Sequence, residues 1–408
     1  MTRLCRATCV ALTLAALLGL GCDDAHNSAD NTGSDTATAD DSNSASDDTP
    51  TGQAGSLDAG KRVDGGAPQK PTGDGGAQKQ PVVDASLSSA SADSSAPQAD
   101  AQAAQPADAS AVADAGSAPQ AGKKFVGNIT TRGQVRSDFS MFWDQITPEN
   151  EGKWGSVEAT RNQMNWAALD RIHDYAKQHG VIFKQHNFVW GSQQPGWLAG
   201  LSAADQRAEV EEWIRLFCER YPDVSLIDVV NEPPPHTSPV YMQALGGAGA
   251  SGYDWIVQTF KWARQYCPKA VLILNDYNNL EYEKDATHFI DIAKKVKAAG
   301  APIDAVGAQA HAVSKMTSDA LKKALDQMSS QTGLPVYITE YDIDEADDAK
   351  QAAIMKAQIP LFWDHSAVKG ITLWGYVSGA TWEPNTGLMS ESGQQRPAMK
   401  WLLEFLKR

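Results

Sequence analysis

Residues 122–408 are predicted to form an α/β fold, a (β/α)8 TIM barrel, and three observations support this prediction. Short apolar segments alternate with longer segments of helical periodicity along this part of the chain. The apolar segments are continuous, which is typical of parallel strands that are buried on both faces. Eight such segments occur, the number that the barrel requires. An open, doubly wound sheet is the alternative, but no glycine-rich phosphate loop follows the first segment.

The predicted elements alternate in chain order. The strands are Phe125–Thr130, Gln145–Asn150, Val181–Trp190, Ser225–Glu232, Ala270–Asn278, Ala305–His311, Pro335–Ile343 and Gly370–Tyr376. Helical patterns between them include Ala203–Arg220, Asp254–Tyr266, Lys284–Ala299, Thr317–Gln331 and Asp348–His365. In a barrel of this type the functional side chains gather at the carboxyl ends of the strands.

The first 22 residues have the pattern of an export signal. Arg3 and Arg6 precede the apolar segment Val10–Leu20, which is too short to span a bilayer comfortably. The segment ends at Cys22, as in a bacterial lipoprotein signal, in which the cysteine becomes the lipidated first residue. We therefore expect an exported protein, anchored to a membrane surface through lipid on Cys22. An ordinary cleaved signal and an uncleaved anchor are the alternatives.

Residues 23–121 are rich in Ala, Ser, Asp, Gly and Pro, and they contain no aromatic residue. Such a composition cannot bury enough apolar area to offset the entropy of ordering the chain. We expect a disordered, acidic linker that holds the following domain away from a surface. This segment carries most of the net charge of −15, and nothing in the chain is basic enough to predict nucleic-acid binding.

Two of the five cysteines, Cys218 and Cys267, lie in the part of the chain that is predicted to fold. Each lies near the end of a helical pattern, just before an apolar strand, and export permits a disulfide between them. Two buried free thiols are the alternative. No HExxH motif or closely spaced cysteine pair predicts a metal site, so we expect no metal and no cofactor. We expect a monomer.

Nearly every predicted strand ends in polar or tryptophan side chains. These residues include Glu149, Asn150, His186, Trp190, Gln193, Asn231, Glu232, Asn275, Gln309, His311, Glu340, Asp342 and Trp374. Amides and carboxylates bind sugar hydroxyls, and tryptophan rings stack on the apolar faces of sugars. Glu232 and Glu340 end the fourth and seventh strands, and two such carboxyl groups are what cleavage of a glycosidic bond needs. A shared cleft of low dielectric separates their pKa values, so that one is protonated and the other ionised.

Seven ordered segments resemble those of glycoside hydrolase family 10, whose typical members are endo-β-1,4-xylanases. The segments are TPENEGKW, HNFVWGSQQPGW, DVVNE, LNDYN, GAQAH, ITEYDI and LWGYVSGATW. The resemblance implies that Glu232 is the general acid/base and Glu340 the nucleophile of a double displacement that retains anomeric configuration. It also implies a separation of ~5–5.5 Å between the two carboxyl groups. His311 matches the residue that orients the nucleophile, and Asn231 matches a contact to the sugar 2-hydroxyl.

The resemblance also implies a set of sugar-binding residues. On the glycone side they are Glu149, Asn150, Lys153, His186, Trp190, Gln193, Gln309, Trp374 and Trp382. The counterparts of Gln193 and Trp382 crowd the sugar C5 position, which favours xylose over glucose. Tyr277 matches a residue on the aglycone side. Asp342 is expected to orient its neighbours, and strand alternation predicts that Tyr341 points away from Glu340.

Three positions depart from the family pattern. Gly191 stands where a histidine is usual, Pro233–Pro235 stiffen the loop after Glu232, and Glu383 stands where a basic residue is common. Gly191 affects substrate fit and pH optimum more than the reaction, and the three prolines affect the aglycone subsites. Two alternatives to a xylanase therefore remain: an enzyme of the same mechanism with another β-1,4-glycan preference, and a non-catalytic xylan-binding lipoprotein. The intact pair Glu232 and Glu340 favours an enzyme.

Overall fold

The computed structural model describes residues 124–408. The predicted export signal, the lipidation site Cys22 and the linker of residues 23–121 lie outside the described residues. Predictions about them are therefore not tested by the structure.

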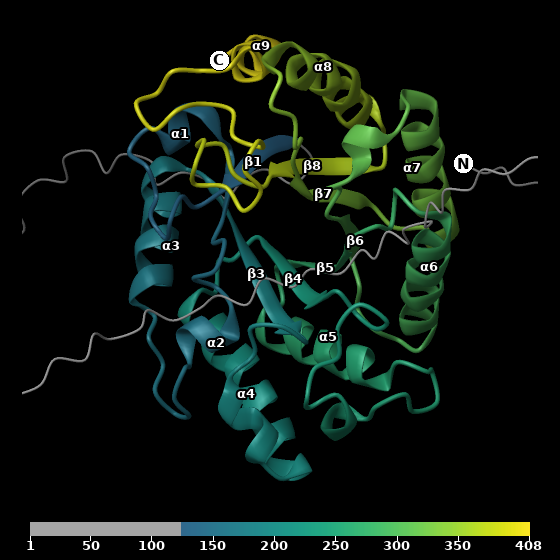
Figure 1. Ribbon diagram of the computed structural model, residues 1–408. Coiled ribbons are helices and arrows are strands. Elements are labelled where there is room, and N and C mark those ends of the chain that lie inside the picture. The colour runs from purple at the N-terminus through teal and green to yellow at the C-terminus, as the bar shows by residue number, and fades with distance from the viewer. Residues whose placement is uncertain (1–123) are drawn as a thin grey trace, which may run out of the picture. The chain divides into compact units, whose positions relative to one another are not determined.

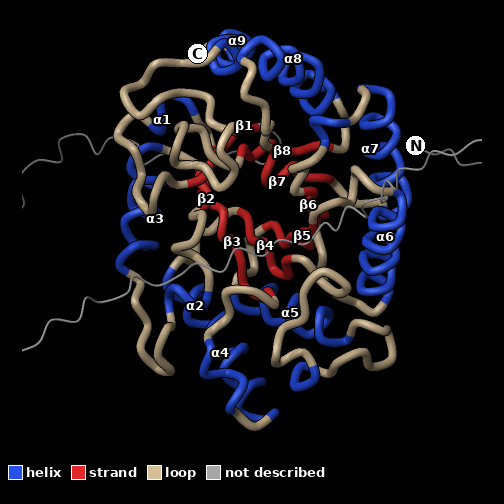
Figure 2. The backbone as a smooth tube through the Cα atoms, viewed as in Figure 1, coloured by secondary structure: helices blue, strands red, loops and turns tan. Residues whose placement is uncertain are grey.

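Eight parallel strands close into a barrel in the order β1 to β8, which confirms the predicted (β/α)8 fold. Figure 2 shows the strands as a central ring with the helices around it. The strands are β1 Phe125–Ile129, β2 Gln145–Thr147, β3 Ile182–Trp190, β4 Leu226–Asn231, β5 Val271–Asp276, β6 Ala305–Ala308, β7 Val336–Tyr341 and β8 Val368–Leu373. The ring closes where Phe125 of β1 pairs with Gly370 of β8.

The helices follow the strands in alternation, as Figure 1 shows. They are α1 Phe139–Phe142, α2 Trp154–Val157, α3 Ala167–His179, α4 Ala203–Arg220, α5 Asp254–Tyr266, α6 Glu283–Ala298, α7 Ser318–Thr332, α8 Asp348–Asp364 and α9 Pro397–Leu406, with 3-10 helices at Gly196–Gly200, Gln243–Leu245 and Val313–Lys315. Side-chain caps fix the starts of three long helices. Ser202, Thr317 and Asp347 accept bonds from the first-turn N–H groups of α4, α7 and α8.

Cys218 at the end of α4 and Cys267 just after α5 form a disulfide, with 5.2 Å between their Cα atoms. Both side chains are buried. The structure therefore decides between the two alternatives that the sequence left open. The disulfide ties two neighbouring helices on the outside of the barrel.

The core fills the barrel and the layer between strands and helices. Val229 and Val230 of β4 are fully buried, one on each side of the barrel wall. Among residues 124–408, no helix is long and apolar enough to cross a membrane.

Candidate active site

A cavity of about 650 Å³ opens at the carboxyl ends of the strands. Its lining residues are Glu149, Asn150, Lys153, His186, Trp190, Glu232, Tyr277, Asn278, Gln309, His311, Glu340, Trp374 and Trp382. All of them except Asn278 are residues that the sequence predicted for the site. The parallel barrel therefore brings side chains from distant parts of the sequence to one opening.

Glu340, at the end of β7, lies at the base of this cavity with only 4% of its surface exposed. Asn275 Nδ2 donates to its Oε1 at 3.0 Å, and His311 Nε2 lies 3.4 Å from its Oε2. Burial alone would raise the pKa of Glu340, but His186, His311 and Lys184 outweigh burial and lower the pKa to about 2. Glu340 is therefore ionised throughout the neutral range, as a nucleophile requires.

Glu232, directly after β4, has neutral hydrogen-bond partners instead. Trp190 Nε1 donates to its Oε2 at 2.8 Å, while Gln309 Nε2 and Asn231 Nδ2 donate to its Oε1 at 3.0 and 3.2 Å. Burial raises the pKa of Glu232, and the negative charge of Glu340 adds to this effect. A carboxyl group with a raised pKa suits a general acid.

Asn275, at the end of β5, connects the two carboxyl groups; the sequence prediction placed it at a strand end but gave it no role in the site. Its Nδ2 donates to Glu340 Oε1 and, at 2.8 Å, to Asn231 Oδ1. Thr339 Oγ1 donates to Asn275 Oδ1 at 2.7 Å, which fixes the orientation of the amide. The position of Asn275 at a strand end was the sequence feature that could have indicated a role in the site.

His311 and Asp342 lie beside Glu340, in a linked arrangement. His311 Nδ1 donates to Asp342 Oδ2 at 2.9 Å, and Trp382 Nε1 donates to the same oxygen at 2.7 Å. Burial would lower the pKa of His311, but the carboxylates of Asp342 and Glu340 outweigh it and raise the pKa to about 10. A charged His311 thus stabilises the ionised form of Glu340. Tyr341 points the other way, as predicted, and its hydroxyl bonds to Gln358.

The predicted glycone residues other than Gln193 line the cavity. Lys153 Nζ donates to Asn150 Oδ1 at 3.0 Å and lies 4.9 Å from the centre of the Trp190 ring. Gln193 Nε2 reaches the same Asn150 oxygen at 3.2 Å, although Gln193 is exposed and does not line the cavity itself. Burial lowers the pKa of Lys153 and raises the pKa of Glu149. These groups form a polar wall beside an aromatic face, which suits a sugar ring.

His186 and Trp374 close the base of the cavity. Their rings meet edge to face with centres 5.1 Å apart. His186 Nδ1 donates to Asp228 Oδ2 at 2.9 Å, and Lys184 lies 2.8 Å from the same carboxylate. His186 is therefore held in place from inside the barrel. Trp382, by contrast, is 52% exposed at the rim.

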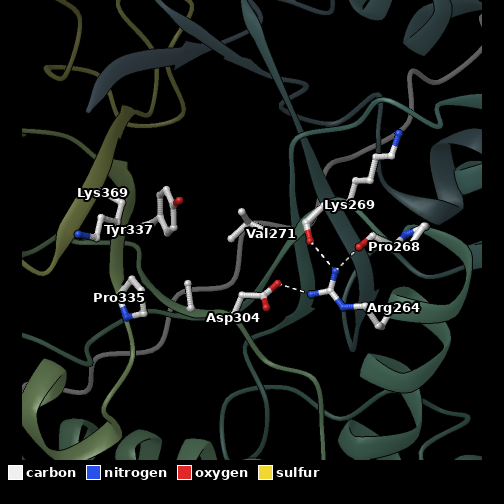
Figure 3. Close-up of a pocket in the computed structure, with 10 residues that line it drawn as sticks. Arg264, Pro268, Lys269, Val271, Asp304, Pro335, Tyr337 and Lys369 are labelled. Atoms are coloured by element: carbon white, nitrogen blue, oxygen red, sulfur yellow. Dashed lines mark hydrogen bonds and ion pairs between the residues drawn. The ribbon is translucent and has the colours of Figure 1, made fainter. Parts of the chain in front are cut away.

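A second cavity, of about 520 Å³, lies at the opposite, amino-terminal ends of the strands. Figure 3 shows Arg264 paired with Asp304 there, with Tyr337 and Lys369 across the opening. No pair of acidic side chains lines this cavity. Among residues 124–408, no group of three or more His, Cys, Asp or Glu side chains is placed to hold a metal ion. The chemistry is therefore assigned to the cavity at the carboxyl ends.

Residues 109–405 match the family model for Glycosyl hydrolase family 10. The chain belongs to glycosyl hydrolase family 10. Endo-1,4-beta-xylanase B of Cellvibrio japonicus is 52% identical over 282 residues, which cover 69% of this chain and 45% of that protein. The chain thus spans about half the length of this relative. Endo-1,4-beta-xylanase A of Caldicellulosiruptor saccharolyticus is 30% identical over 269 residues, covering 60% of this chain and 78% of that protein.

Solved structures of family 10 enzymes have the same fold. Xylanase 10B from Thermotoga petrophila, solved in complex with xylobiose, superposes with a TM-score of 0.61 at 25% sequence identity, over 70% of this chain and 95% of that one. Xylanase 10B from Thermotoga maritima gives a TM-score of 0.62 at 24% identity, over 70% and 95% of the two chains. The second comparison supports the barrel fold alone.

Proposed function

We propose that this family 10 protein is a retaining endo-β-1,4-xylanase, which hydrolyses internal bonds of xylan by double displacement. The observation that carries the proposal is the opposite perturbation of two carboxyl groups in one cavity. Glu340 is held ionised by cationic neighbours, whereas burial raises the pKa of Glu232. The names of the similar xylanases support xylan as the substrate.

The reaction proceeds in two steps through these groups. Glu340 attacks the anomeric carbon, while Glu232 gives its proton to the leaving oxygen, so the glycosidic bond breaks and a glycosyl ester on Glu340 forms. Glu232, now ionised, takes a proton from water, and the oxygen of that water attacks the anomeric carbon. The ester bond breaks, Glu340 leaves as a carboxylate, and Glu232 is again protonated. No metal or cofactor takes part in either step.

The test is a product profile on xylan, arabinoxylan and carboxymethylcellulose. We expect short xylo-oligosaccharides from the two xylans and no release from the cellulose derivative. Cleavage of the cellulose derivative but not xylan would replace the substrate assignment with another β-1,4-glycan. Binding of xylan without release of any product would favour the non-catalytic alternative.

Variants separate the roles of the two carboxyl groups. Glu340→Ala is expected to abolish hydrolysis of xylan and of an activated aryl xylobioside. Glu232→Ala is expected to retain formation of the glycosyl intermediate from the activated substrate, because its leaving group needs little acid assistance. Glu404→Ala, which removes an exposed carboxylate on α9, is the control and retains wild-type rates. Wild-type turnover by Glu340→Ala would overturn the nucleophile assignment.

We also propose that the protein is exported and anchored to a membrane surface through lipid on Cys22. The pattern of residues 1–22 supports this proposal. Labelled palmitate is expected to enter the wild-type protein in bacterial cells but not the Cys22→Ser variant. Equal labelling of both proteins would overturn the assignment.

A further inference from the structure

The segment after β4, Pro233–Ser238, folds back onto the residue that carries the general acid. Glu232 has φ +50°, a left-handed conformation that is costly for a residue with a side chain. Three hydrogen bonds hold it there. Glu232 N donates to Asn275 O at 2.9 Å, and both the N–H and the hydroxyl of Thr237 donate to Glu232 O, at 3.1 and 2.7 Å. The orientation of Glu232 therefore depends on where this segment is anchored.

Gly191 makes room for the returning segment. A Cβ atom at residue 191 would lie 2.5 Å from Ser238 N and 2.7 Å from Thr237 Cβ, so no other residue fits without displacing the segment. Gly191 N also donates to Thr237 Oγ1 at 3.2 Å. The glycine after Trp190 and the folded-back loop thus depend on each other.

His236 anchors the segment to the next strand, β5, which pairs with β4 in the barrel (Figure 1). Its Nδ1 donates to Asp276 Oδ1 at 2.7 Å, and its ring stacks on Tyr277 with centres 3.9 Å apart and 17° between the planes. The side chains of His236 and Asp276 are only 12% and 4% exposed. His288 Nε2 adds a bond from α6 to the carbonyl of Pro234 at 2.9 Å.

Tyr277 links this anchor to the substrate cavity, because it is one of the lining residues. His236 covers one face of the Tyr277 ring, which leaves the other face for a sugar. A stacked aromatic pair is stiffer than a single exposed ring, since each ring restricts the rotamers of the other. His236 thus contacts the aglycone platform directly and connects through Thr237 to the backbone of the acid.

We propose that His236, held by Asp276 in the space that Gly191 leaves open, is a positioning residue for the leaving-group side of the site. It fixes the Tyr277 platform that binds the leaving sugar, and it fixes the backbone that aims Glu232 at the leaving oxygen. This inference rests on the proposed function and deepens it. The proposal predicts that loss of His236 lowers kcat/KM for substrates that need acid assistance and have an aglycone sugar. It lowers kcat/KM less for substrates that need neither.

The charge of His236 gives the proposal a second, independent consequence. Asp276 on β5, Asp285 on α6 and Glu232 after β4 are the acidic groups that face it. Burial alone would lower the pKa of His236, but the bond to Asp276 outweighs burial and the pKa is raised. His236 therefore keeps its positive charge to a higher pH than an unperturbed imidazole does. A nearby cation favours ionised Glu232, so a neutral residue at 236 is expected to raise the pKa of Glu232.

The test compares His236→Asn and His236→Phe in the full chain. Asparagine keeps a donor for Asp276 but loses the ring and the charge, whereas phenylalanine keeps the ring but loses the donor and the charge. We expect kcat/KM for xylotetraose to fall at least about tenfold in His236→Phe, the size of one lost hydrogen bond to a charged group. We expect kcat/KM to fall in His236→Asn as well, because this variant loses the ring that stacks on Tyr277. We expect the fall for 2,4-dinitrophenyl xylobioside to be less than about threefold, because this substrate needs no acid and has no aglycone sugar. In both variants the alkaline limb of kcat/KM is expected to move to higher pH.

The matched control is His173→Asn. His173 Nε2 donates to Asp223 at 2.8 Å, and its side chain is 10% exposed, so this histidine resembles His236 in geometry and burial, although Asp223 is 47% exposed. It lies on α3 against Phe183 and Tyr221, and it does not line the cavity. This variant is expected to retain both rates and the wild-type pH profile.

Two results would overturn the proposal. One is a kcat/KM for xylotetraose within about twofold of wild type in both His236 variants, since such a change lies below the worth of a single hydrogen bond. The other is an equal loss on both substrates with an unmoved alkaline limb, which indicates a role in folding alone. If the wild-type protein cleaves no xylo-oligosaccharide, the proposed function itself fails. That result would overturn both the proposed function and the proposed role of His236.

Discussion

The carboxylate of Glu340 is expected to stabilise the fold as well as to carry the reaction, and Glu340→Gln tests this. Its side chain is buried, and its pKa is lowered from 4.5 to about 2 by neighbouring cations. The difference corresponds to about 3 kcal/mol of stability at neutral pH. Glutamine keeps the shape and the bond from Asn275 but removes the charge. We therefore expect the variant to be less stable by about 3 kcal/mol at pH 7.

The sign of the pH dependence follows from the direction of the shift. Because the folded pKa lies below the unfolded value, the contribution is complete above pH 4.5 and is lost as the pH falls through 2. The stability difference between wild type and Glu340→Gln should therefore narrow to about 1.5 kcal/mol at pH 3. Groups that do not interact with Glu340 titrate in the same range, but they contribute equally to both proteins and cancel in the difference.

Urea unfolding at pH 7, 5, 4 and 3, followed by tryptophan fluorescence, measures the difference. The matched control is Glu149→Gln, a carboxyl group in the same cavity whose pKa is raised by burial. Its ionised form costs stability, so this variant is expected to be at least as stable as wild type at pH 7. A Glu340→Gln difference that is absent at pH 7, or constant from pH 7 to 3, would refute the assignment of a charge-stabilised nucleophile.

Three further predictions concern single contacts. Trp190→Phe removes the indole N–H that donates to Glu232, and this bond favours the ionised form of Glu232. The pKa of Glu232 should therefore rise, and the alkaline limb of kcat/KM should move to higher pH. An unmoved limb would contradict this prediction. Gly191→Ala should lower stability by about 1–3 kcal/mol in urea unfolding and reduce xylan hydrolysis, because its Cβ displaces Thr237. Gly196→Ala, whose Cβ meets nothing within 4 Å, is the control. The Cys218→Ala, Cys267→Ala double variant opens a loop of 49 residues, and its free energy of unfolding should fall by up to about 4 kcal/mol in urea unfolding. Unchanged stability would show that the disulfide contributes nothing.

The barrel was predictable from the sequence because its strands are buried on both faces. Continuous apolar runs placed all eight strands within a few residues of the observed bounds. The helices α4 and α5 were predicted with their observed ends, since amphipathic periodicity is clear over 18 and 13 residues. The helices α1 and α2 were not predicted, because four residues are too few to show a period.

The lining of the cavity was predictable for a similar reason. Parallel strands of a closed barrel all present their carboxyl ends to the same opening, so a list of strand ends is nearly a list of lining residues. The omission of Asn275 has a physical reason. Its role depends on simultaneous bonds to Asn231 of β4 and Glu340 of β7, and no local sequence pattern encodes such a geometry.

The loop after β4 was the least predictable part. Its three prolines indicated a stiff segment, but stiffness does not say where the segment goes. The backbone of Glu232 turns through a left-handed conformation, and the loop then packs in the space above Gly191. Gly191 and the prolines that precede His236 each look like a separate departure from the family pattern. In space they are two parts of one arrangement, because the missing side chain at 191 lets the loop carry His236 onto Tyr277.

The two glutamates have different pKa values because the side chains around them differ in charge. Both carboxyl groups are buried in one cavity, so burial alone would raise both pKa values and leave neither ready to attack. Glu340 has cations within reach, and these reverse the effect of burial. Within residues 124–408, the side-chain donors at hydrogen-bond distance from the Glu232 carboxyl group are the neutral groups of Trp190, Gln309 and Asn231, and these reduce the effect of burial without reversing it. Exchange of the two roles would therefore require exchange of the surrounding charges, not of the glutamates themselves.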